Sequence, residues 1–172
     1  MNSNIQEKLK LTKLLALDFD GTLTLGAYVV FQEDGKESVV CSRRDSLGVD
    51  LLKKEGIEVV VISKETNSVV EKRCNKMSIK CFFGVDNGKS KLDILESYAT
   101  ENGIGQNEIV YMGDDVTDIP SIEFAGVGAT VADAHNKCKE VADYTTKNRG
   151  GDGAVREICE MILNSQDKKL NY

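Results

Sequence analysis

Residues 14–24 read LLALDFDGTLT, an apolar run that ends in two carboxylates, a glycine and two threonines. The run has no helical spacing, and such a run is typical of a strand buried on both faces of a parallel sheet. In open α/β sheets the functional groups lie just beyond the carboxyl ends of these strands. We therefore expect Asp18 and Asp20 to lie at the functional edge of a sheet.

A second stretch, residues 109–118, reads IVYMGDDVTD and also ends in acids. Two strands that deliver carboxylates to one sheet edge predict a pocket for a hard divalent cation, and such pockets mainly serve phosphate chemistry. A calcium loop beginning at Asp18 is excluded, because its glycine and glutamate positions hold Leu23 and Val29.

The composition predicts one globular domain. Of 172 residues, 41% are hydrophobic and 29% are charged. No apolar run approaches the roughly 18 residues of a membrane span, and the amino-terminal stretch lacks the apolar core of a signal peptide. We therefore expect a cytoplasmic protein without a membrane partner. The net charge of −6 argues against nucleic acid as a partner. The five cysteines form an odd set without a CxxC pair, which predicts buried thiols rather than disulfides or a zinc site.

The chain alternates apolar strand patterns with helical ones, which predicts an α/β fold: a Rossmann-like parallel sheet with helices on both faces. We expect a single domain over residues 1–172, with its core at about 13–163 and polar tails at both ends. Residues 1–12 form either a frayed lead-in or a short docked helix. The expected strands are 13–17, 57–62, 79–83, 108–112 and 127–131, and the expected helices are 46–55, 66–77, 91–102, 134–142 and 154–163, with a short one near 119.

Residues 27–41 predict a β-hairpin with its turn at 32–37, because Asp-Gly lies there between two β-rich runs. The first two core strands leave room for only this hairpin and one helix between them, and the third and fourth leave room for one helix. No cap domain fits in either connection. A site without a cap is open to water, so either the substrate is large or a neighbouring subunit closes the pocket.

DFDGTLT at 18–24 followed by GDDVTD at 113–118 resembles the haloacid dehalogenase superfamily of phosphohydrolases. The chain is similar to its small capless branch of 3-deoxy-octulosonate 8-phosphate phosphatases, nonulosonate 9-phosphate phosphatases and the carboxy-terminal domain of CMP-sialate synthetases. Further matching segments are Arg44-Asp45, VADAH at 131–135 and RGGDGAVRE at 149–157. The resemblance also implies a homotetramer, with the hairpins at its centre, and a place in lipopolysaccharide biosynthesis.

Within this family, Asp18 is expected to act as nucleophile through an aspartyl-phosphate, and Asp20 as general acid and base. Mg²⁺ is expected on Asp18, the backbone carbonyl of Asp20 and Asp114. Asp115 and Asp118 are expected to support these ligands without contacting the metal themselves.

The resemblance implies that Ser63 donates a hydrogen bond to the phosphate, although a helix cap explains this residue equally well. A lysine should neutralise charge at the nucleophile. Lys91 has the family's spacing to Gly113, and Lys89 is the alternative.

Four residues are candidates for substrate binding: Arg44, Arg149, Gly150 and Gly151. Glycine amides before a helix can bind an anion, whereas a flexible connector explains the two glycines equally well. For Arg44 the alternative is a structural ion pair. We interpret His135 as a helix-start residue rather than a catalytic one.

The acidic motifs, together with the family resemblance, imply a Mg²⁺-dependent phosphatase that acts on a 3-deoxy-2-ulosonic acid phosphate, with the 8-phosphate of 3-deoxy-D-manno-octulosonate as the first candidate. Residues 63–67, Ser-Lys-Glu-Thr-Asn, depart from the Thr-Gly-Arg of the octulosonate enzymes, so a nonulosonate 9-phosphate is the alternative. The alternative from a different functional class is a non-catalytic oligomerisation domain like that of the CMP-sialate synthetases. Those domains have lost acids that this chain keeps, which favours an enzyme.

Overall fold

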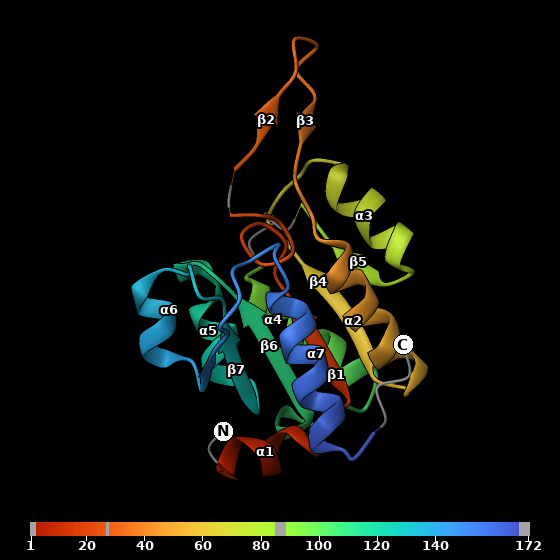
Figure 1. The fold of residues 1–172 in the computed structure, drawn as a ribbon, viewed down its shortest axis with the longest axis vertical. Helices are drawn as coiled ribbons and strands as arrows, with labels where there is room; N and C mark the ends of the chain where they lie inside the picture. The colour runs from red at the N-terminus through yellow and green to blue at the C-terminus, as the bar shows by residue number, and fades with distance from the viewer. Residues whose placement is uncertain (1–2, 27, 85–88, 169–172) are drawn as a thin grey trace.

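The computed structural model describes residues 3–26, 28–84 and 89–168, which form a six-stranded parallel sheet with helices around it (Figure 1). The strand order is β5-β4-β1-β6-β7-β8, with the LLAL strand in the interior of the sheet. All neighbours pair in parallel, as predicted. The strands are β1 Leu14–Leu17, β4 Glu58–Ile62, β5 Lys80–Phe82, β6 Ile109–Gly113, β7 Val127–Thr130 and β8 Tyr144–Thr145.

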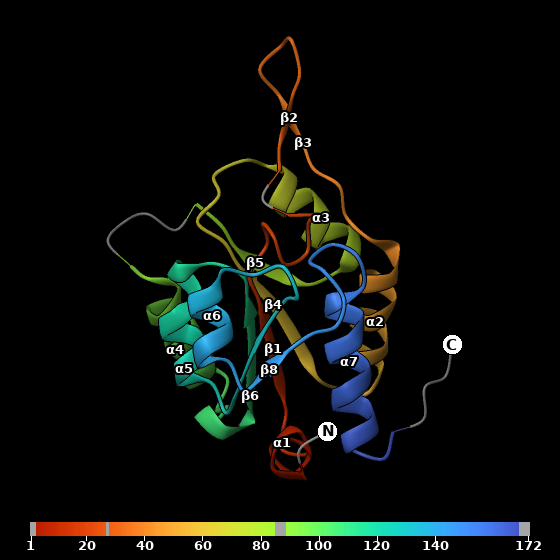
Figure 2. The ribbon, with the colours of Figure 1, turned by 60° about the vertical axis from the view of Figure 1, so that its left-hand side comes forward.

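Helices cover both faces of the sheet, which confirms the predicted fold class. In Figure 2, α2 and α7 lie on one side of the sheet, and α4, α5 and α6 lie on the other. The helices are α1 Ser3–Leu9, α2 Arg43–Lys54, α3 Val69–Met77, α4 Lys91–Glu101, α5 Ile119–Phe124, α6 Asn136–Val141 and α7 Ala154–Ser165. The described α2 and α7 have 12 residues each, about 18 Å, and no helix in the described part of the chain has the length and apolarity to cross a bilayer.

The register of the sheet brings the predicted site residues to one edge. Leu17, the last residue of β1, pairs with Val61 of β4 and with Met112 of β6. Strands β4 and β6 each end one residue after that pair. The amide of Asp18 still donates to the carbonyl of Met112 (2.9 Å). The residues that follow β1, β4 and β6 therefore leave the sheet side by side.

The β-hairpin is present but shorter than predicted. Its strands are β2 Val30–Phe31 and β3 Glu37–Ser38, which pair antiparallel and form a separate two-stranded sheet. The hairpin projects from the body of the protein in both ribbon views. Ala27, where the predicted hairpin begins, lies outside the described residues.

Several element boundaries differ from the predicted ones. Of the two alternatives for the amino terminus, the docked helix is found, and Leu9 of α1 is fully buried. Helix α3 begins at Val69 rather than at residue 66, because the preceding polar residues make side-chain hydrogen bonds of their own. Strand β8 was not predicted, since two residues leave no periodic pattern.

Asp45 lies on helix α2 but caps helix α7. Helix α2 begins at Arg43, three residues before the predicted start, and is capped by Ser42, whose hydroxyl accepts from the amide of Arg44 (3.1 Å). The Asp45 carboxylate, fully buried, instead accepts from the amides of Gly153 (3.4 Å) and Arg156 (2.9 Å) at the start of α7. Gly153 has no side chain with which to cap that helix, so α2 supplies the cap.

Replacing Asp45 should destabilise the fold through the loss of this cap. We expect Asp45→Ala to lower the free energy of unfolding by about 2–3 kcal/mol, because two buried amides lose their acceptor. Urea denaturation measures this change. The matched control is Asp50→Ala on the exposed side of α2, which should stay within about 0.5 kcal/mol of the wild type. Equal stability of both variants would contradict the capping role.

Candidate active site

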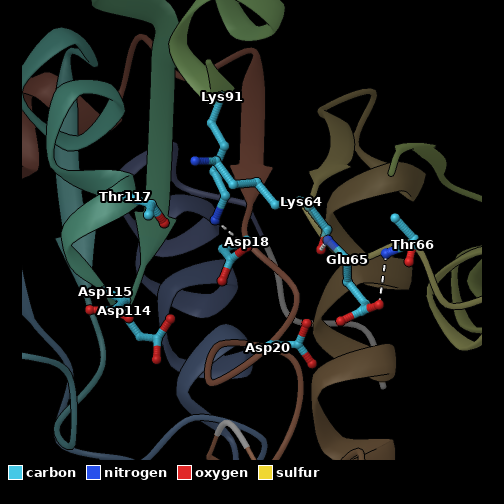
Figure 3. A pocket seen from close by; sticks show the side chains of 10 residues that line it. Asp18, Asp20, Lys64, Glu65, Thr66, Lys91, Asp114, Asp115 and Thr117 are labelled. Atoms are coloured by element: carbon cyan, nitrogen blue, oxygen red, sulfur yellow. Dashed lines mark hydrogen bonds and ion pairs between the residues drawn. The ribbon is translucent and has the colours of Figure 1, made fainter. Parts of the chain in front are cut away.

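A cleft of about 370 Å³ opens at the carboxyl edge of the sheet, where β1, β4 and β6 end. Five of its lining residues are the predicted Asp18, Asp20, Ser63, Lys91 and Asp114 (Figure 3). The wall is completed by the predicted Asp115 and by four residues without a predicted role, Lys64, Glu65, Thr66 and Thr117. The three strand ends and the start of α4 thus form one site.

Lys91 lies buried at the bottom of the cleft. Its ammonium donates to Asp18 Oδ1 (2.5 Å) and to Asp118 Oδ1 (2.7 Å), and its side chain is only 4% exposed. Burial lowers the pKa of Lys91, but the charges of Asp18 and Asp118 outweigh burial and raise it, so the amine is an ammonium. The alternative candidate, Lys89, is exposed and does not line the cleft.

Asp118 is saturated with hydrogen bonds. Its Oδ1 also accepts from the hydroxyl of Tyr111 (2.7 Å), a fully buried residue of β6. Its Oδ2 accepts from the amides of Asp114 and Asp115 (both 3.2 Å). Asp118 therefore holds Lys91 and the loop after β6 in place. Sequence reasoning missed Tyr111, because a tyrosine inside a buried strand is indistinguishable from a core residue.

The carboxylates of Asp18, Asp114 and Asp118 suit a hard divalent cation. They can place an oxygen each within 4.8 Å of one another. When all three are ionised against the single ammonium of Lys91, two negative charges remain in excess, which one divalent cation neutralises. Because Asp118 is saturated, Asp18 and Asp114 are the oxygen donors that remain for Mg²⁺. No backbone hydrogen bond between described residues uses the Asp20 carbonyl, the third predicted ligand.

Without a cation, this crowding favours protonated acids. Burial, and then the charge of Asp118, raise the pKa of Asp18 well above its usual range, with Lys91 opposing them. The same two causes raise the pKa of Asp114 to about 7. A proton shared by these acids offsets part of the negative charge that a bound metal ion would otherwise neutralise.

Gly21 lets the loop after β1 approach the loop after β6. Its φ is +76°, and a Cβ there would lie 1.9 Å from Asp114 Oδ2. Only glycine tolerates both the left-handed conformation and this close approach. The turn at residues 20–22, the DGT turn, therefore needs glycine at its centre so that the two acidic loops can lie this close together.

Asp20 and Glu65 lie on the side of the cleft away from Asp114 and Asp115 (Figure 3). Burial, and then the charge of Glu65, raise the pKa of Asp20, which suits a residue that must hold a proton. The Glu65 carboxylate accepts from the amides of Thr66 (2.7 Å) and Asn67 (2.8 Å). Ser63 is buried, and its hydroxyl accepts from the amide of Glu65 (3.1 Å), which leaves its proton to donate into the cleft.

The amides of Gly150 and Gly151, for which an anion site and a flexible connector were the alternatives, both donate to acceptors within the protein. The Gly150 amide donates to Asp133 Oδ1 and the Gly151 amide donates to the carbonyl of Thr22, both at 3.0 Å. A Cβ on Gly150 would lie 1.7 Å from the carbonyl oxygen of Gly21, so the glycines serve close packing against the DGT turn.

Arg149 lines a second hollow next to the main cleft. The hollow has a volume of about 300 Å³ and is lined by Gly21, Gly26, Tyr28, Asp114, Asp133 and Arg149. Asp114 is therefore shared by both spaces. Arg149 Nε donates to Asp133 Oδ2 (3.0 Å), and its side chain is 62% exposed. Asp133, within the VADAH segment, was not assigned a role from sequence although it orients Arg149.

Two candidates lie outside the cleft. Arg44 is exposed and its Nη1 lies 3.7 Å from Asp152 Oδ1, which matches the ion-pair alternative. His135 caps α6, and its Nδ1 accepts from the amide of Lys137 (3.2 Å), as expected for a helix-start residue.

Comparison with known proteins identifies relatives of the whole chain. The family model of haloacid dehalogenase-like hydrolases matches residues 45–158. The 3-deoxy-D-manno-octulosonate 8-phosphate phosphatase KdsC of Escherichia coli is 34% identical over 170 residues, covering 98% of this chain and 88% of that protein.

Solved structures agree with this match. The 3-deoxy-D-manno-octulosonate 8-phosphate phosphatase of Moraxella catarrhalis, in complex with a magnesium ion, a phosphate ion and KDO, superimposes with a TM-score of 0.91 at 32% identity, covering 97% of this chain and 94% of that one. The cobalt-bound form of the Haemophilus influenzae enzyme gives a TM-score of 0.86 at 30% identity, covering 93% and 92%.

Metal affinity should depend on pH through Asp114. A proton must leave this acid before a cation binds, so a pKa of about 7 places the loss of affinity near neutral pH rather than near 4. We expect the Mg²⁺ affinity, measured by isothermal titration calorimetry, to fall about tenfold between about pH 8 and about pH 6. Asp114→Asn should bind Mg²⁺ weakly at either pH. An affinity that stays constant over this range would contradict the assignment.

Proposed function

The chain belongs to the haloacid dehalogenase-like hydrolase family, and we propose that it is a Mg²⁺-dependent phosphatase for the 8-phosphate of 3-deoxy-D-manno-octulosonate. The observation that carries the proposal is the buried Lys91 bound to Asp18 beside Asp114, at the end of the central strands. The relatives named above act on this substrate type by their names, and one was solved with Mg²⁺, phosphate and KDO.

Asp18 is the proposed nucleophile. An oxygen of its carboxylate attacks phosphorus, and the bond from phosphorus to the sugar oxygen breaks. Asp20 gives its proton to that leaving oxygen. Water then attacks the aspartyl-phosphate, Asp20 takes a proton from the water, and inorganic phosphate leaves with Asp18 restored. When bound, Mg²⁺ on Asp18, the Asp20 carbonyl and Asp114 neutralises charge on the phosphoryl group.

The remaining groups have supporting roles in this proposal. Lys91 offsets negative charge at Asp18, and the Ser63 hydroxyl donates to a phosphate oxygen. Asp118 fixes Lys91, and Asp115, which accepts from the amide of Val116 (2.7 Å), fixes the turn after β6. Burial, and then the charge of Glu65, raise the pKa of Asp20, which favours the protonated form that the leaving oxygen requires.

Arg149 is the proposed contact of the sugar acid's carboxylate, because it lines the hollow that adjoins Asp114. For Arg44 the ion pair with Asp152 favours the structural alternative. Glu65 favours a second candidate substrate, a nonulosonate 9-phosphate. Glu65 lines the cleft. It belongs to the segment 63–67, which departs from the Thr-Gly-Arg of the octulosonate enzymes.

The assembly is also part of the proposal. Five exposed apolar side chains lie on the hairpin and its two arms: Leu25, Tyr28, Val30, Phe31 and Val40. Since no cap domain covers the open cleft, we propose a homotetramer in which hairpins meet and neighbours narrow the sites. A cytoplasmic location and a place in lipopolysaccharide biosynthesis accompany this assignment.

Substrate preference tests the proposal directly. We expect kcat/KM for the octulosonate 8-phosphate to exceed that for hexose phosphates by about a hundredfold or more, because a hexose phosphate has no carboxylate to accept charge-assisted hydrogen bonds from Arg149. The nonulosonate 9-phosphate belongs to the same panel, and its preference would select the second candidate. Asp18→Asn, the control, should lose at least about a thousandfold in kcat. Wild-type-like turnover of that variant would refute the nucleophile, and no activity on any phosphate ester would favour the non-catalytic domain.

The oligomeric state should depend on the hairpin. Phe31 is 71% exposed, so a charge there should oppose burial in an interface without harming the core. We expect wild type to be a tetramer and Phe31→Asp to dissociate in light scattering at micromolar concentration. Leu47→Asp, on an exposed part of α2, is the matched control and should leave the assembly intact. A fully active wild-type monomer of about 19 kDa would rule out the tetramer.

A further inference from the structure

One side-chain hydrogen bond joins the hairpin to Asn67, the residue that follows the cleft wall of residues 63–66. Asn67 Nδ2 donates to Glu37 Oε2 (2.8 Å), and within the described residues this is the only side-chain hydrogen bond between a strand of the hairpin and the body. Both residues are half-buried, whereas residues 31–36 of the hairpin are exposed. Helix α3, which begins just after Asn67, lies beside the base of the hairpin in Figure 1.

Asn67 connects this bond to the cleft. Its amide donates to Glu65 Oε1 (2.8 Å), which also accepts from the amide of Thr66 (2.7 Å). Its side-chain oxygen accepts from the amide of Val69 at the start of α3 (3.1 Å). One residue therefore holds the hairpin, the first turn of α3 and the pocket carboxylate of Glu65.

Lys91 and its two carboxylate partners, Asp18 and Asp118, are fixed independently of this connection. Lys91 is held by Asp18 and Asp118, on α4, β1 and the loop after β6, and none of these contacts involves the hairpin or residues 64–69. Figure 3 shows Glu65 and Thr66 on the side of the cleft away from Asp114 and Asp115. We therefore expect a substrate whose phosphate lies at Asp18 to meet the wall formed by residues 64–66 with its non-phosphate part.

From these contacts we propose that Glu37 and Asn67 are positioning residues, which couple the orientation of the hairpin to the Glu65 wall of the cleft. The coupling sets the fit of the bulky part of the substrate, whereas the contacts of Lys91 with Asp18 and Asp118 stay as they are. The substrate part of this inference rests on the proposed function, whereas the coupling itself does not.

Hydrogen exchange tests the coupling without any substrate. In Glu37→Ala, Asn67 loses its outer acceptor, so we expect the amides of Thr66 and Asn67 to exchange about tenfold faster. Glu37→Gln keeps an acceptor oxygen without the charge and should stay within about twofold of wild type. Glu33→Ala, an acid removed from the exposed hairpin tip, is the matched control and should change nothing. Exchange in Glu37→Ala within about twofold of wild type overturns the proposal, whatever the substrate is.

Kinetics with two substrates tests the consequence. For Glu37→Ala we expect KM for the sugar acid phosphate to rise about tenfold with kcat within about twofold, and both constants for p-nitrophenyl phosphate to stay at wild-type values. Glu37→Gln should restore the KM. Equal losses on both substrates, or none on either, overturn the positioning role. Wild-type protein that fails to hydrolyse sugar acid phosphates would refute the proposed function instead, and hydrogen exchange would still decide the coupling.

Discussion

The buried ammonium of Lys91 is the constraint on which the rest of the site depends. It needs two carboxylates from different strands at the same time, because removing one partner of a buried pair costs about 3–5 kcal/mol. Helix α4 must therefore begin where it does. A capping box between Ser90 and Asp93 fixes that first turn. Because Lys91 is the first residue of α4, the cap also fixes the position of its charge.

The charge balance of this site separates chemistry from recognition. Asp18, Asp114 and Asp118 follow rigid central strands and carry more negative charge than Lys91 offsets, which makes a divalent cation the natural complement. This local balance explains how a protein of net charge −6 can still attract a phosphate. The residues that we propose to face the rest of a substrate stand on loops instead, where substitution disturbs the core least.

Much of this site could be predicted from the sequence, because its acids directly follow apolar strands and parallel strands end at a common edge. Asp18 and Asp114 are the clear cases. Other features have no local pattern. Asp45 caps a helix that begins more than a hundred residues later, and Asp133 orients Arg149 across a loop. The engaged amides of Gly150 and Gly151 could not be foreseen either, since a glycine that binds an anion and one that packs against a neighbouring turn look the same in sequence.

No cap domain is inserted in the part of the chain that the structure describes, and the proposals above give the hairpin two tasks in its place. Phosphoryl transfer benefits from the exclusion of water, and the cleft alone is open. If hairpins of neighbouring copies meet through side chains such as Phe31, their orientation becomes fixed by the assembly rather than by the monomer. Glu37 then transmits that orientation to Asn67, and Asn67 to the carboxylate of Glu65. Assembly would thus shape the pocket wall as well as cover it, which a rigid cap on a single chain could not do.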